Sequence, residues 1–116
     1  MSSAAFRNLA AYRLAAALAD EIYAMVGKWS SFDRWSTGVQ LVRAADSVGA
    51  NIAESAGRWH EADKRRLCVI ARGSLYETEH WLERAQARGL TGDGLESQID
   101  ELARTLNGLL KRPNPG

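Results

Sequence analysis

Residues 38–57, GVQLVRAADSVGANIAESAG, carry the pattern that decides the fold. Apolar residues recur there every three or four positions, and Gly57 follows the last of them. This spacing puts them on one face of a helix, and glycine is common just past a helix end. We predict an amphipathic helix from about Gly38 to Ala56, with an apolar face made of Leu41, Ala45, Val48, Ile52 and Ala56.

The same period continues on both sides of this stretch. Residues 6–26, 61–88 and 95–110 each carry apolar residues at helical spacing, and no segment alternates as a strand would. Residues 28–37 are predicted to form a connector, with Ser31 and Asp33 as candidate helix caps. The predicted buried side of residues 61–88 comprises Leu67, Ile70, Ala71, Ser74, Thr78, Trp81 and Ala85.

Four helices with short turns, each with one apolar face, predict an all-α fold: an antiparallel up-and-down four-helix bundle. The chain has 116 residues, which is enough for one domain with one core. We assign residues 1–112 to that single domain and residues 113–116, PNPG, to a C-terminal tail.

Composition narrows the functional classes. No stretch approaches the roughly 20 apolar residues of a membrane span, and the first residues do not resemble a secretory signal. The single cysteine, Cys68, cannot close a disulfide within the chain, so we expect a cytoplasmic protein without membrane contact. Basic and acidic residues nearly balance, 15 against 14, which argues against a dedicated nucleic-acid-binding protein.

Catalytic motifs are missing from the sequence. Cys68 has no histidine at helical spacing, and neither a Gly-x-Ser-x-Gly turn nor a phosphate-binding loop occurs. Di-metal sites in bundles need two Glu-x-x-His pairs, and only Glu77 and His80 form one. We therefore expect no enzyme activity, no cofactor, no metal and no small-molecule substrate. A metalloenzyme built around Glu77 and His80 remains the third-ranked hypothesis.

A polar stripe lies opposite the apolar face of the predicted helix 38–56. A solvated surface is the simplest interpretation of such a stripe. Its amide and hydroxyl side chains, mixed with single charges, also fit a buried hydrogen-bonded network that reaches the next helix, or a face that contacts a partner subunit. The candidate interface or network residues are Gln40, Arg43, Ser47, Asn51, Glu54, Ser74 and Glu77.

Basic residues form one cluster after this stripe. On its own the cluster is best interpreted as a solvated helix face, and nucleic-acid contact is the alternative. Its members are Arg58, Lys64, Arg65, Arg66 and Arg72. Trp29, Trp35 and Trp59 lie near predicted helix ends, where aromatic side chains are favoured anchors of protein interfaces. They make self-association plausible.

Several strings resemble the signature of the 23S rRNA intervening-sequence proteins. They are residues 40–54, QLVRAADSVGANIAE, then Gly57-Arg58, and residues 70–77, IARGSLYE. Phe6-x-x-Leu9 and Ile22-Tyr23 fit the same pattern, so the resemblance covers nearly the whole chain. Ser55 stands where the family usually has glycine, His60 replaces a usual Ser or Thr cap, and the connector lacks a proline common near position 30.

The resemblance implies a four-helix bundle that assembles as a ring, typically a homopentamer. It also implies similarity to accessory proteins of diversity-generating retroelements, which bind nucleic acid and a reverse transcriptase. The first hypothesis is therefore a non-enzymatic homo-oligomeric scaffold or binding protein. The second is an RNA- or DNA-binding accessory protein, in which a ring would repeat the basic cluster five-fold.

Overall fold

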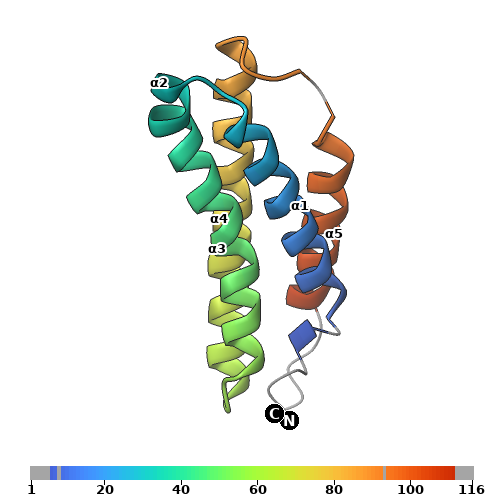
Figure 1. Ribbon diagram of the computed structural model, residues 1–116. Helices are drawn as coiled ribbons and strands as arrows, with labels where there is room; N and C mark the ends of the chain where they lie inside the picture. Colours follow the sequence, from blue (N-terminus) through green and yellow to red (C-terminus); the bar gives the residue numbers. More distant parts are fainter. Residues whose placement is uncertain (1–5, 8, 93, 112–116) are drawn as a thin grey trace.

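The computed structural model describes residues 6–7, 9–92 and 94–111. Four long helices pack side by side, α1 and α4 running one way and α3 and α5 the other (Figure 1). No strand occurs in these residues, and the predicted all-α up-and-down bundle is confirmed. The predicted tail, residues 113–116, lies outside the described part. The elements are α1 (Ala10–Gly27), α2 (Ser31–Asp33), η2 (Arg34–Gly38), α3 (Val39–Ala56), α4 (Glu61–Ala87) and α5 (Glu96–Lys111).

One hydrophobic core lies between the four long helices. Each helix contributes buried apolar side chains, and each fully buried Leu, Ile or Val among them stabilises the fold by about 1.5–3 kcal/mol. The largest of them are Leu18 and Ile22 of α1, Leu41, Val48 and Ile52 of α3, Leu75 of α4, and Leu102 and Leu106 of α5.

Helix α1 begins at Ala10, not at Phe6 as the sequence pattern predicted. Leu9 has an extended backbone, with φ −72° and ψ 128°, and its N–H donates to the Phe6 carbonyl at 3.1 Å. The Phe6 ring packs edge-on against Tyr12, with ring centroids 4.9 Å apart. Residues six apart lie on different faces of a continuous helix, so this contact requires the break at Leu9.

The predicted connector is mostly helical, because only Lys28–Ser30 separate α1 from α2. Neither predicted cap residue is the cap. Ser30 is, since its Oγ accepts a hydrogen bond from the Asp33 N–H at 3.4 Å and donates to Asp33 Oδ2 at 2.9 Å. Asp33 occupies the third helical position, as the acidic residue of a capping box does.

The π-helix η2 joins α2 to α3 without a break in the helix. Its last residue, Gly38, is buried against α1, and a Cβ atom built there would lie 2.6 Å from Val26 Cγ1. The neighbouring Thr37 is also buried, and its hydroxyl accepts a hydrogen bond from Arg88, the residue after α4, at 2.8 Å. The π turn therefore packs against α1 through Gly38 and is hydrogen-bonded to the end of α4 through Thr37.

The predicted buried side of α4 is partly wrong. Ile70 is 42% exposed, and Ser74 and Trp81 are half-buried. The helix packs on both α3 and α5, and its buried side also includes Leu75 and Leu82, of which Leu82 lines a cavity with residues of α5. Its buried residues are Leu67, Ala71, Leu75, Thr78, Leu82 and Ala85. On α3, Ala56 was predicted to be buried and is exposed.

Candidate functional site

A small hydrogen-bonded network joins α3 to α4. The hydroxyls of Ser47 and Ser74 lie 3.0 Å apart. Asn51, one turn after Ser47, donates through Nδ2 to the Ser47 hydroxyl at 3.1 Å and to the Ser47 carbonyl at 2.8 Å. All three residues are half-buried. The structure thus brings together three of the seven residues of the predicted polar site.

The other four residues of that set do not join the network. Gln40, Arg43 and Glu54 are exposed on α3. Glu77 is exposed on α4 and accepts a hydrogen bond from the Trp81 indole at 3.3 Å. Glu54 instead pairs with Arg58 at 2.7 Å, and that hydrogen bond, with the charge of Glu54, raises the pKa of Arg58.

Replacing Ser47 and Ser74 singly and together by alanine should reveal their coupling. Ser74 loses its hydroxyl partner when Ser47 is replaced, and Ser47 keeps only Asn51 when Ser74 is replaced, so the two single changes and the double change should differ from additivity by about 0.5–1.5 kcal/mol. Urea unfolding of the four proteins measures this. Ser97, which is exposed on α5, provides a control whose replacement by alanine should be additive with either change.

Some residues of the basic cluster contact α5 and others do not. Arg65 donates to the Leu110 carbonyl and Arg72 to Asn107 Oδ1 at 3.0 Å, so both tie α4 to α5. A cation at the last carbonyls of a helix also complements the helix dipole. Lys64 pairs with Glu61 at 3.6 Å, and Arg66 is exposed.

Large aromatic side chains lie exposed at both ends of the bundle. Tyr23 is 69%, Phe32 80% and Trp35 72% exposed near the α1–α3 connection. Trp59 is 90% exposed at the opposite end, in the turn between α3 and α4 (Figure 1). Trp29 differs, because it packs partly against the core.

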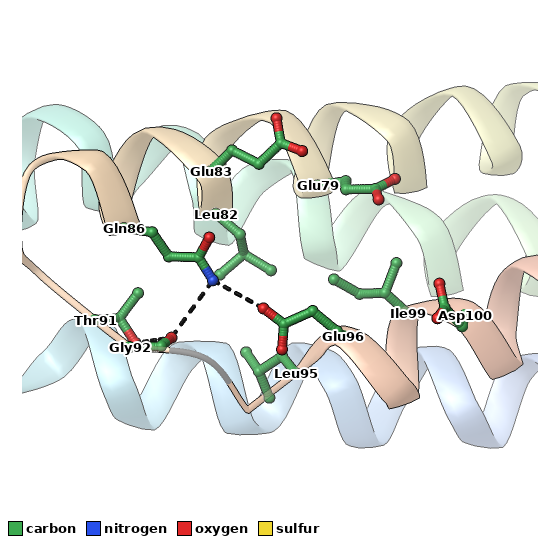
Figure 2. A pocket seen from close by; sticks show the side chains of 10 residues that line it. All are labelled: Glu79, Leu82, Glu83, Gln86, Thr91, Gly92, Leu95, Glu96, Ile99 and Asp100. Carbon is green, nitrogen blue, oxygen red and sulfur yellow. Dashed lines mark hydrogen bonds between the residues drawn. The ribbon is translucent and has the colours of Figure 1, made fainter.

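Sequence analysis missed an acidic groove between α4 and α5. Figure 2 shows its carboxylates, Glu79 and Glu83 of α4 and Glu96 and Asp100 of α5, around a cavity of ≈ 230 Å³ with apolar residues in its lining. Within each helix the two carboxylates are four residues apart, a spacing that puts them on one helix face and could have been noticed in the sequence. Glu96 accepts from the Gly94 N–H at 2.8 Å and from Gln86 at 2.9 Å, and the backbone hydrogen bond from Gly94 lowers its pKa.

The candidate metal pair is engaged elsewhere. Glu77 and His80 both contact Trp81, the histidine through an edge-on ring contact at 4.9 Å. Over the described residues, no group of three or more His, Cys, Asp and Glu side chains is placed to bind a metal ion. Cys68 is half-buried, and its thiol donates to the Ser55 hydroxyl at 3.7 Å. None of the described helices is long and apolar enough to cross a membrane.

Comparison with known proteins agrees with the resemblance noted in the sequence. No curated protein matches the chain. The family model for the 23S rRNA-intervening sequence protein matches residues 7–111, which include all four long helices and the network between α3 and α4. The chain therefore belongs to the 23S rRNA-intervening sequence protein family.

Proposed function

We propose that the chain is a non-enzymatic protein that assembles into a homopentameric ring and serves as a scaffold or binding module. The observation that carries this proposal is the exposure of four large aromatic side chains, Tyr23, Phe32, Trp35 and Trp59, each at least 69% accessible. Aromatic side chains are enriched at the centres of protein interfaces, where their burial contributes much of the affinity.

Polar groups beside the aromatic ends support the same proposal. Gln40 and Arg43 are exposed on α3, within two helical turns of Trp35 in sequence. Large aromatic and neutral polar side chains together fit the mixed apolar and polar character of subunit interfaces. Arginine is also enriched at subunit interfaces, so the exposed Arg43 fits a contact with another copy.

Sedimentation of the pure protein tests the assembly. We expect a species of at least about five times the chain mass of 12.7 kDa, and replacing Trp35 by alanine should shift it toward smaller species. The matched control is Arg34→Ala, an exposed neighbour without an aromatic ring. A wild-type protein that sediments as a monomer at high concentration would contradict the proposal.

The second candidate function is that of an accessory protein that binds RNA or DNA. The observation that favours it is the gathering of basic residues near one end of the bundle, where Arg58 follows α3 and Lys64, Arg65 and Arg66 lie in the first two turns of α4. A ring would present this end several times and add weak contacts together.

A labelled structured RNA titrated across a salt series tests the second candidate. Binding should weaken steeply as salt rises, and Arg66→Gln should lower affinity and reduce the salt slope, because one phosphate contact per copy is lost. Glu21→Gln, a neutralisation on α1 far from the basic end, is the control. Absent or salt-insensitive binding would remove the candidate.

A further inference from the structure

One line of residues on α4 changes charge along its length. Steps of 4, 3, 4, 3 and 4 keep residues on the same line of a helix. The line begins with basic residues and ends with acidic ones, and its step pattern is identical when read backwards. We call it the α4 stripe, and its residues are Arg65, Val69, Arg72, Tyr76, Glu79 and Glu83.

The α4 stripe borders α5 at both of its ends. At the basic end, Arg65 and Arg72 contact Leu110 and Asn107 of α5. Each of these contacts uses one N–H of a guanidinium that has five, so donors remain for a partner. At the other end, Glu79 and Glu83 line the acidic groove with carboxylates of α5 (Figure 2).

Among the described residues, the carboxylates of the groove have no basic partner. The ion pairs found among the described residues are Arg58–Glu54 and Lys64–Glu61. Both lie where α3 turns into α4, at the other end of α4 from the groove. Glu96 does accept hydrogen bonds, but from the neutral Gln86 amide and a backbone N–H. The α4–α5 face is therefore positive at one end and negative at the other.

Apolar side chains alternate with the charged ones on the α4 stripe, with Val69 between the two arginines and Tyr76 between Arg72 and Glu79. Val69 is 41% and Tyr76 51% exposed on the α4 stripe. Gly73 lies between them on the exposed side of α4, and a Cβ atom at that position would meet nothing within 4 Å. Aromatic and arginine side chains, such as Tyr76 and Arg72 here, are enriched at protein interfaces.

We propose that the α4–α5 face pairs with the same face of a second copy of the chain, in antiparallel orientation. Reversal of one stripe brings Arg65 opposite Glu83 of the other copy and Arg72 opposite Tyr76, a charge pair and a cation–π pair. The basic half of each copy then lies against the acidic groove of the other. A parallel copy would instead oppose like charges.

A second copy fits this face better than another partner does. When one copy is turned end to end, its acidic end lies opposite the basic end of the other copy, and the reverse holds at the other end. The contact is isologous, so it closes at two copies and cannot build a ring. It uses a different surface from the aromatic ends assigned to the ring contact above, and the two contacts add. Two rings joined through this face would form an assembly with an even total number of copies.

Charge reversal tests the pairing. Glu83→Lys and Arg65→Glu each place like charges opposite one another, so each should weaken pairing by at least about ten-fold and halve the mass measured by light scattering. Mixing the two variants should restore the wild-type mass, because Glu at position 65 then faces Lys at position 83 and the native pair forms on the other side. Glu21→Lys on α1 is the control with the same charge change.

Cysteine cross-linking provides a second measurement, because Arg65→Glu also removes the contact with Leu110 and could unfold the chain. In a Cys68→Ser background, antiparallel pairing places position 69 of one copy opposite position 79 of the other. Val69→Cys mixed with Glu79→Cys should form a disulfide on oxidation more readily than either alone. Equal cross-linking in all three samples would overturn the proposed register.

The masses separate this proposal from the ring. Ten copies falling to five with Glu83→Lys would support both contacts, and two falling to one would support the pairing alone. Five copies, unchanged by either variant, would overturn the pairing and leave the ring. A wild-type monomer would contradict both, and chains that lengthen with concentration would replace the isologous pair by a head-to-tail contact.

Discussion

Replacing Leu75 by alanine is expected to lower the free energy of unfolding by about 2–5 kcal/mol, because it removes a fully buried side chain and leaves a cavity among four helices. Leu75 is 0% exposed in the core. Ile70→Ala, on the same helix, should cost less than about 1 kcal/mol, since much of that side chain already meets water. Urea unfolding followed by tryptophan fluorescence measures both.

The comparison discriminates between two orientations of α4. The sequence pattern placed Ile70 in the core, whereas the structure places Leu75 there and leaves Ile70 42% exposed. If the two changes lower the free energy of unfolding equally, and still do so after dilution, the observed orientation of α4 is contradicted. A cost for Ile70→Ala that disappears on dilution would instead locate Ile70 in a contact between copies, because assembly stabilises the folded chain by an amount that rises with the logarithm of concentration.

The number and direction of the long helices could be predicted because each carries an apolar face and the first three end near a glycine. On α4 the pattern was ambiguous. Two overlapping sets of residues recur there at helical spacing. One comprises Leu67, Leu75 and Leu82, and the other includes Ile70 and Trp81. Periodicity shows that a helix has an apolar side, but the neighbouring helices decide which of two overlapping stripes becomes the core. Packing on α3 and α5 together selected the leucines.

The candidate site was predictable where its residues adjoin an apolar face on neighbouring helices. Ser47 and Ser74 border the stripes of consecutive helices, so their meeting followed from a short turn. The inward contacts of Arg65 and Arg72 depend on where α5 ends, which no local pattern gives. The capping box at Ser30 and Asp33 was readable from sequence, because serine followed three residues later by an acidic residue is a known signal of a helix start.

Replacing Gly38 by alanine should destabilise the protein by about 1–3 kcal/mol, because the new methyl group overpacks the contact between η2 and α1. Its Cβ would lie 2.6 Å from Val26 Cγ1 and 3.1 Å from the Asp33 carbonyl oxygen. Val26 is 4% exposed and β-branched, so it has little freedom to turn its methyl group away. This cost outweighs the gain of about 0.5–1 kcal/mol that alanine usually brings to a helix.

Two further variants show whether the clash is the cause. Gly108→Ala, where a Cβ meets nothing within 4 Å, should stabilise the protein by about 0.5–1 kcal/mol through helix propensity alone. Val26→Ala removes the obstructing methyl, so the double change Gly38→Ala with Val26→Ala should cost less than the sum of the single changes. Additive costs would mean that Gly38 is required by the π turn itself and not by the approach of α1. The glycine would then mark a constraint of η2, and any other residue would fail there whatever occupied position 26.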